Sequence, residues 1–373
     1  MSQTKAQLVD AVDGSIVDAD ITGLSASKLS GALPAISAAN LTSVPSGNQN
    51  LIINGAMNVA QRGTSSTSSG YHTIDRFKTT FAGTDEAPTF AQADVASGTT
   101  PYTSGFRKCL KVTNGNQTSG AGAADNILIS YSIEAQDLAT SGWNYTSSSS
   151  DVTLSFWVKS SVAQNFYGFL LTDDGSSQLY SFETGSLSAD TWTKVTKTIS
   201  GNSNLTFNND NGEGILLRFV CFQGTDNTGS TTLNQWAAWN SSAIMPDNTS
   251  TWYTTNNATF ELTGVQLEVG STATSFEHRS YGQELMLCRR YYQGPPLSST
   301  GAVTIYGCRY STSSSFTIVE HIPHMRAVPT LTYSARATSS GWNYASYSGK
   351  ERFQVLMTSV SGYVSTPAFD AEL

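Results

Sequence analysis

Residues 151–159 read DVTLSFWVK, and this stretch indicates the fold class. The positions of one parity are all apolar: Val152, Leu154, Phe156 and Val158. Thr153, Ser155, Trp157 and Lys159 occupy the other parity. Successive side chains of a β-strand point to opposite faces, so this alternation predicts a strand with one buried face and one face toward solvent.

Two further stretches indicate the same fold class. Residues 214–222, GILLRFVCF, are apolar on both parities and predict a central strand that is covered on both faces. Residues 259–269, TFELTGVQLEV, change parity at Thr263 and Gly264, which predicts a β-bulge. Turn signals separate these strands, and no helical pattern lies between them. The sequence thus predicts a mostly β protein with a jelly-roll β-sandwich over residues 49–279.

One short helix is expected after the sandwich. Residues 280–293, SYGQELMLCRRYYQ, place Leu285, Cys288 and Tyr292 at helical spacing, and the following Gly and two Pro residues end the helix. We assign residues 280–296 to this helix and a linker. The apolar stretches that follow have no helical spacing, so residues 297–373 predict a smaller C-terminal β domain.

The N-terminal 48 residues differ from the rest of the chain. Between Ile16 and Val44 single apolar residues are separated by Gly, Ser, Ala and Thr, and no aromatic residue precedes Tyr71. This spacing gives neither a helical stripe nor a strand face in one chain, but three copies around an axis could bury it. We expect residues 1–48 to form an extended stalk or docking segment of a homotrimer. A flexible linker is the alternative.

Composition excludes several classes of protein. Among 373 residues, Lys and Arg number 20 and Asp and Glu 28, so the net charge of −8 argues against a nucleic-acid partner. No run of ~18 apolar residues occurs, and the start has no secretion signal, so no membrane insertion is expected. The four scattered cysteines, at 109, 221, 288 and 308, predict free buried thiols in a chain made in a reducing cytoplasm.

Three stretches carry a family resemblance. They are NLIINGAMNVAQRGT at 50–64 with Tyr71, Asp75, Arg76 and Phe77 after it, GVQLEVGSTATSFEHRSYGQELMLCRRYY at 264–292, and IPHMRAVPTLTYSA at 322–335. In this order and spacing, the chain resembles bacteriophage tail-fibre and related virion structural proteins. Phe77 departs from that pattern, because Trp is common there, and His321 and His324 accompany the last stretch. Both departures leave ligand contacts open.

The resemblance implies a virion protein with a jelly-roll domain similar to carbohydrate-binding modules. It implies a homotrimer that is assembled in the host cytoplasm and joined to other virion proteins through residues 1–48. The location is expected to be a tail fibre, with the capsid as the alternative.

The motif residues also have a physical interpretation without the family. Asp75 and Arg76 lie between apolar Ile74 and Phe77, so we expect at least one of them to be a partly buried structural partner rather than a catalyst. Glu268 runs into a turn and is expected to cap backbone amides or to meet an arginine.

No catalytic residue, metal ligand or cofactor is assigned. The sequence lacks nucleophile-elbow, zinc-protease, P-loop and dinucleotide motifs. Acidic pairs could serve a glycosidase if the fold joined them; they are Asp85 with Glu86, Asp173 with Asp174, and Asp210 with Glu213. Turn residues are the simpler interpretation. The stretch NNDNGEG at 208–214 supplies oxygen ligands but lacks the spacing of a calcium loop, so calcium binding there stays an open alternative. We therefore expect no enzyme, with a polysaccharide depolymerase as the less favoured alternative.

Aromatic residues give the stronger functional signal. Sugar rings stack on Trp and Tyr, while amides and hydroxyls contact sugar hydroxyls. The sequence SGWNY occurs twice in Ser-rich segments, and Trp157 shares a parity with polar residues. The candidate glycan contacts are Trp143, Tyr145, Trp157, Trp342 and Tyr344. Trp236, Trp239 and Trp252 lie in a Thr- and Asn-rich stretch, and Trp192 is expected in the core. The alternative is that loop tryptophans cap the sandwich or fill a trimer interface.

Together these observations predict a trimeric tail fibre that adsorbs to host surface glycan or lipopolysaccharide without catalysis. The alternative is a head-decorating fibre or another structural virion component with no receptor of its own.

Overall fold

The computed structural model describes residues 50–294, 308–309, 315–320, 323–336, 344–350, 352–357 and 363–373, which belong to one compact unit. The stalk predicted over residues 1–48 lies outside the described residues.

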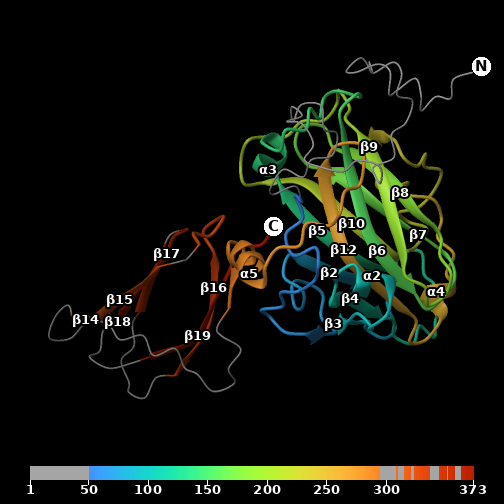
Figure 1. Cartoon of the computed structure of the whole chain (residues 1–373). Coiled ribbons are helices and arrows are strands. Elements are labelled where there is room, and N and C mark those ends of the chain that lie inside the picture. Colours follow the sequence, from blue (N-terminus) through green and yellow to red (C-terminus); the bar gives the residue numbers. More distant parts are fainter. Residues whose placement is uncertain are drawn as a thin grey trace, which may run out of the picture. The chain divides into compact units, whose positions relative to one another are not determined.

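Two six-stranded antiparallel sheets form the body of the protein (Figure 1). Sheet I has the order β1 (Ser65–Ser66), β3 (Thr89–Asp94), β4 (Lys108–Thr113), β12 (Thr259–Val269), β6 (Asp151–Ser160) and β9 (Thr193–Ser200). Sheet II has the order β11 (Trp236–Ala238), β8 (Gln178–Ser186), β7 (Asn165–Thr172), β10 (Glu213–Gln223), β5 (Asn126–Glu134) and β2 (Phe77–Ala82).

The chain crosses repeatedly from one sheet to the other. Strands β4, β6 and β9 of sheet I are followed by β5, β7 and β10 of sheet II, and β5 and β8 lead back to β6 and β9. This alternation is typical of a jelly roll. The predicted β-sandwich is confirmed: residues 151–159 form β6, and residues 214–222 lie in β10 between β5 and β7.

The core lies between the two sheets. Phe156 of β6 and Phe219 of β10 pack edge to face, with ring centres 4.9 Å apart. Leu154 and Leu217, on the same inward parities, are fully buried. Burying each such side chain stabilises the fold by about 1.5–3 kcal/mol. The apolar parity read from residues 151–159 is therefore the inner face of sheet I.

The predicted bulge in β12 is confirmed. The pairing of β12 with β6 shifts register between Thr263 and Gln266. Gly264 adopts a φ of +64°, which residues other than glycine rarely adopt. The bulge turns Val265 and Leu267 toward the core, although they have the opposite parity to Phe260 and Leu262.

In the described part of the chain, four short helices accompany the sheets: α2 (Thr100–Thr103), α3 (Ala135–Ala139), α4 (Thr251–Thr254) and α5 (Tyr281–Arg289). The predicted helix is α5, which begins at a capping box between Ser280 and Gln283. It ends earlier than expected because the chain turns at Arg290 into the short strand β13 (Tyr292–Gln293). No helix in the described part of the chain is long and apolar enough to cross a membrane.

The C-terminal strands form two small antiparallel sheets. One has the order β13, β19 (Tyr363–Asp370) and β16 (Thr330–Arg336). The other has the order β14 (Cys308–Arg309), β15 (Ser315–Glu320), β18 (Arg352–Met357) and β17 (Tyr344–Ser348). The pairing of β13 with β19 brings the segment after α5 beside the C-terminal strand.

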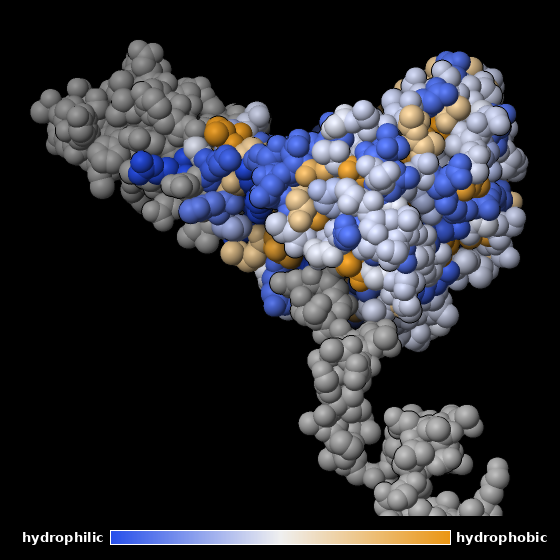
Figure 2. Space-filling model, turned by 90° about the horizontal axis from the view of Figure 1, so that it is seen from above, coloured by the Kyte–Doolittle hydropathy of each residue, from blue (hydrophilic) through white to orange (hydrophobic). Residues whose placement is uncertain are grey.

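The visible surface is mostly weakly hydrophilic. Figure 2 shows pale and blue residues over most of the sandwich, with orange residues in small separate areas. Such a surface fits the low content of charged residues, 13 %. Of the cysteines, Cys109, Cys221 and Cys288 are free and buried, as expected.

Candidate functional site

The first SGWNY segment lies at the core and not on the open surface. Trp143 is only 3 % exposed, and its Nε1 donates a hydrogen bond to the carbonyl of Ser150 at 3.0 Å. Its ring and the half-buried ring of Tyr145 both pack against Phe207. The expectation of an exposed Trp143 is wrong, because the loop folds its largest apolar side chain over the sandwich end. Trp143 is therefore too enclosed to stack on a sugar, while a glycan contact by the half-buried Tyr145 stays a prediction.

The second SGWNY segment falls largely outside the described residues. Trp342 is not described, and Tyr344 is described only as the first residue of β17, without its side chain. Their role as glycan contacts stays a prediction.

Trp157 lies on the outer face of sheet I, as its parity predicted. In the register of the sheet it stands between Thr263 of β12 and Lys194 of β9. Its side chain is half-buried and packs beside the small cluster around Phe106. One side of the indole is thus supported by the protein, which fixes its orientation.

Trp192 lies beside this position, although the sequence analysis placed it in the core. It is half-buried, like Trp157, and packs on the same outer cluster. Val195 and Ile199 are the inward residues of β9, so Trp192 has the outward parity of Lys194. That parity is the signal in the sequence that could have predicted the surface position of Trp192.

Three charged side chains complete this group. The Nζ of Lys159 lies 5.2 Å from the centre of the Trp192 ring and 2.9 Å from the Oε2 of Glu261. Lys194 is exposed on the other side of Trp157. We call the set of Trp157, Trp192, Lys159, Glu261 and Lys194 the sheet I platform.

The platform is bounded by a second aromatic group. The ring of Phe106 packs against Phe276 at 4.8 Å and against His278 at 5.1 Å. The Nε2 of His278 is 2.9 Å from the carbonyl oxygen of Ser104, which holds the segment after β12 against the outer face. Thr263, beside Trp157 on β12, is buried as well, whereas Lys194, beside Trp157 on β9, is exposed.

The platform combines the groups that contact sugars. The indoles supply apolar faces for sugar C–H groups, while the ammonium and carboxylate groups donate and accept hydrogen bonds. The Lys159–Glu261 pair balances its own charge, so a neutral hydroxylated ligand can replace water there without leaving a net charge buried.

The other tryptophans are occupied by packing. Trp252 is fully buried, and its Nε1 donates to the carbonyl of Thr259 at 3.0 Å. Trp236 donates from Nε1 to the carbonyl of Ser200 at 2.8 Å and packs against Tyr180. Trp239 packs against the outer cluster of sheet II.

The family-like motifs meet in a buried polar cluster. Asp75 is fully buried and accepts two hydrogen bonds from Gln61, one of them from its backbone N–H at 2.9 Å. Burial raises the pKa of Asp75 to about 6, although the hydrogen bonds from Gln61 oppose this shift. Arg76 is 1 % exposed, and its Cζ lies 3.4 Å from the centre of the Tyr291 ring. The expected structural role of this motif therefore has geometric support.

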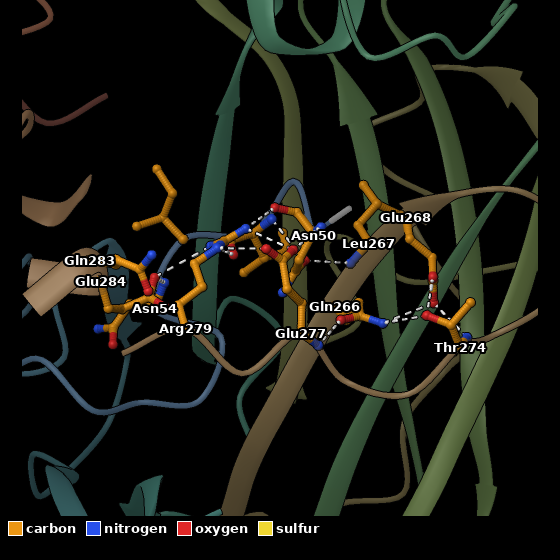
Figure 3. A network of polar contacts seen from close by, with 12 residues as sticks. Asn50, Asn54, Gln266, Leu267, Glu268, Thr274, Glu277, Arg279, Gln283 and Glu284 are labelled. Carbon is orange, nitrogen blue, oxygen red and sulfur yellow. Dashed lines mark hydrogen bonds and ion pairs between the residues drawn. The ribbon is translucent and has the colours of Figure 1, made fainter. Parts of the chain in front are cut away.

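A second polar network joins the first motif to the segment after β12 (Figure 3). The side chain of Asn50 donates to the carbonyl of Val265 and accepts from the N–H of Leu267, at 3.1 and 3.0 Å. Arg279 donates to the Asn50 carbonyl at 2.7 Å.

Glu268 accepts a hydrogen bond from the N–H of Thr274 at 2.9 Å, which confirms the expected amide cap. Figure 3 shows Glu268 and Thr274 in contact at one end of the network. This network fixes the strand ends that carry the motifs and offers no open carboxylate.

The acidic pairs hold loops. One carboxylate of each pair accepts a hydrogen bond from a backbone N–H group in a loop. Asp85 accepts from Ser119, Asp174 from Asn208, and Asp210 from Gly212. Within the described ranges, no group of three or more His, Cys, Asp or Glu side chains is arranged to hold a metal ion.

A groove of about 650 Å³ lies along α5. Its lining includes Glu277, Arg279, Met286, Arg290 and Pro323. The two arginines are already paired with Glu277 and Glu134, at 3.2 and 2.6 Å. The groove therefore offers less free hydrogen-bonding capacity than its composition indicates.

No protein-family model matches this chain, and no curated protein matches its sequence. Solved structures give distant likenesses. A crystal structure of the enzymatically active domain of Bacteriophage CBA120 tailspike protein 4 aligns with a TM-score of 0.31 and 8 % identity, over 59 % of this chain and 21 % of the tailspike chain.

Two carbohydrate-binding modules align over most of their own length. A structure titled "CBM4 structure and function" gives a TM-score of 0.30 and 13 % identity, over 58 % of this chain and 98 % of that one. The family 11 module from Clostridium thermocellum, in complex with a mixed-linked tetrasaccharide, gives 0.25 and 10 %, over 58 % and 98 %. At such TM-scores, the function has to be argued from this chain's own residues.

Proposed function

We propose that this protein binds glycans without catalysis and that the sheet I platform is its sugar contact. The observation that carries the proposal is the placement of Trp157 and Trp192 on the outer face of sheet I, each half-buried and packed against the cluster around Phe106. A supported indole loses little conformational freedom on binding, so its stacking energy is retained in the affinity.

The polar neighbours support a sugar rather than an apolar ligand. Lys159 and Glu261 form a 2.9 Å ion pair beside Trp192, and Lys194 is exposed next to Trp157. An aromatic ring face with hydrogen-bonding groups at its edge suits a ring that has both C–H faces and hydroxyl groups.

The virion role rests on the resemblance of residues 50–335 to tail-fibre and related virion proteins. In this proposal, the chain is a homotrimeric tail fibre that docks to the particle through residues 1–48. Adsorption to host glycan would use several weak contacts at once, because linked sites raise the overall avidity by ~10²–10⁴. A structural virion component without a receptor is the competing function.

The test is glycan binding by the purified full chain. Wild type is screened against an array of bacterial lipopolysaccharide and capsular glycans, and the strongest binder is then titrated against Trp157→Ala and Trp192→Ala. Loss of one stacking ring is expected to weaken binding about 10-fold, which corresponds to ~1.4 kcal/mol.

Tyr281→Ala is the matched control, since Tyr281 is 59 % exposed on α5 and lies outside the platform. Its affinity should equal that of wild type. Absence of any glycan binding, or equal losses in all three variants with their folds intact, would count against the platform and favour the structural role. Release of reducing ends from a bound polysaccharide would revive the depolymerase.

A further inference from the structure

A polar row crosses the outer face of sheet II, on the opposite side of the sandwich from the platform. In the register of the sheet, Lys78 of β2 is opposite Ser130 of β5, and Ser130 is opposite Arg218 of β10. The residues beside them in sequence, such as Phe77, Ile129 and Leu217, point into the core. The three polar side chains therefore share the outward parity of adjacent strands.

Arg218 lacks the carboxylate that other enclosed arginines of the protein have. Ion pairs with Asp or Glu are formed by Arg62, Arg76, Arg279, Arg290 and Arg326. Within the described part of the chain Arg218 has no ion pair, and its Nε is buried without a hydrogen-bond partner. Its guanidinium carbon lies 5.6 Å from the centre of the Phe169 ring.

The neighbouring hydroxyl is also unsatisfied. Ser130 is 3 % exposed, and its Oγ has no hydrogen-bond partner among the residues described. Buried polar atoms in native proteins normally have a partner, so an orphan donor directly opposite an unpaired guanidinium points to a missing ligand. Lys78 is exposed and adds a third donor in the same row.

Apolar side chains lie on both sides of this row. On one side, Ile244 and Met245 cover Val220 and Leu128 of the same face. On the other side, Leu216 of β10 remains only half-buried. The row is therefore bounded by apolar side chains. Burial lowers the pKa of the Arg218 guanidinium, and the negative charge of Glu213 opposes that shift.

We infer that Lys78, Ser130 and Arg218 form a binding site for the carboxylate of an acidic sugar. A guanidinium can donate two parallel hydrogen bonds to one carboxylate, the serine hydroxyl donates a further one, and the ammonium supplies the second positive charge. The half-buried apolar residues beside the row would contact the C–H groups of the same sugar. A neutral sugar would leave the charge of Arg218 uncompensated.

The site is independent of the proposed function, because it lies on another face and uses other residues. The test measures binding of the full chain to oligogalacturonate, oligomannuronate and hyaluronan oligosaccharides, with methyl-esterified oligogalacturonate as the uncharged counterpart. We expect at least one uronate to bind and the ester not to bind. Arg218→Gln should weaken uronate binding ~10-fold or more, as a charged hydrogen-bonding partner is lost.

Two further variants separate binding from folding. Ser130→Ala removes an orphan hydroxyl, so the melting temperature should stay equal or rise while uronate affinity falls about 3-fold. Arg352→Gln, which removes an exposed arginine of β18, controls for overall charge and should bind like wild type.

Three results would overturn the inference. The first is failure of all three uronates to bind. The second is an equal loss in Arg352→Gln and Arg218→Gln, which would indicate unspecific attraction. The third is Arg218-dependent binding of dextran sulfate without any uronate binding, which would assign the site to a sulfate ester. Trp157→Ala should leave uronate binding unchanged, so this test can fail separately from the platform.

Discussion

Arg76 and Glu372 form a buried ion pair, although 296 positions separate them in the sequence. Their side chains are 1 % and 4 % exposed. Arg76 also packs on the ring of Tyr291 and donates to the carbonyl of Ser132 at 2.6 Å. One guanidinium thus joins the Asp-Arg motif, strand β5, the segment after α5 and the C-terminal residues. These contacts give the buried, charged arginine a structural role.

Breaking this pair is expected to destabilise the protein strongly. Arg76→Met leaves the buried Glu372 carboxylate with Arg62, 3.3 Å away, as its remaining ion-pair partner. The cost is therefore expected to approach, but not exceed, the about 3–5 kcal/mol of a buried charge left without any partner. Removing both charges with Arg76→Met and Glu372→Gln should cost less than the sum of the single changes, because neither partner is then left unpaired. Urea unfolding of the single and double variants measures both quantities.

An exposed ion pair supplies the comparison. Lys108 and Asp94 are 2.6 Å apart, but the Asp94 side chain is 80 % exposed. Lys108→Met should therefore change the free energy of unfolding by less than ~1 kcal/mol. Similar costs for Lys108→Met and Arg76→Met would show that burial does not govern the Arg76 pair.

Replacing Asp75 by Asn is expected to change how stability depends on pH. Burial raises the pKa of Asp75 from 3.8 to about 6 in the folded state, so the folded protein binds the proton more tightly than the unfolded chain. The tighter proton binding stabilises the folded state. This stabilisation is fully present below pH ~4 and is lost as the pH rises through about 6.

The measurement is the free energy of unfolding of wild type and Asp75→Asn at several pH values. Relative to the variant, wild type should lose roughly 3 kcal/mol between pH 4 and pH 7, because a shift of one pKa unit corresponds to ~1.4 kcal/mol. Other titrating groups are common to both proteins and cancel in the difference. Parallel curves over this range would contradict the assignment.

Two of the three tryptophans predicted as glycan contacts should differ in how much their truncation destabilises the protein. Trp143→Ala removes a buried ring and a hydrogen bond to Ser150, and truncation of such a core ring costs about 3–5 kcal/mol. Trp157→Ala removes a half-buried ring at the surface and should cost less, about 1–2 kcal/mol. Chemical unfolding of both variants distinguishes the core residue from the surface residue. Equal losses of stability would contradict the placement of Trp157.

What the sequence could predict depended on the range of the interaction. The alternation in residues 151–159 identified β6 and the outward position of Trp157, because strand parity is local. The same rule places Trp192 on the outer face. The prediction that Trp192 lies in the core was wrong because it relied on the apolar character of tryptophan and not on strand parity. The prediction that Trp143 is exposed was wrong because it relied on the local Ser-rich sequence. That sequence does not indicate that the loop folds back over the end of the sandwich.

Contacts between distant segments could not be predicted in this way. The motif around Asp75 and Arg76 predicts a buried polar partner, but only the fold brings Glu372 to it. The sequence GILLRFVCF likewise does not predict that Arg218 lacks an ion-pair partner. That depends on which residues lie opposite it in neighbouring strands, such as Ser130 and Lys78. Local patterns thus defined the strands, while charge pairing between strands required the structure.

Gly264 provides a test of the bulge in β12. Its φ of +64° disfavours any other residue, and an added Cβ would lie 2.7 Å from the Cζ of the Phe106 ring, closer than carbon atoms pack. Gly264→Ala should therefore destabilise the protein both through backbone strain and by displacing a fully enclosed aromatic ring. Together these effects are expected to cost about 2–4 kcal/mol in unfolding experiments.

Gly98→Ala separates the two effects. Gly98 has a φ of +83°, and a Cβ added there would meet no atom within 4 Å. This variant should show only the backbone cost, about 1 kcal/mol. Since Phe106 supports the cluster on which Trp157 and Trp192 pack, Gly264→Ala should also weaken glycan binding at the platform, whereas Gly98→Ala should not. Equal losses of stability in the two variants would show that the Phe106 ring moves aside at no cost and does not hold the platform in place.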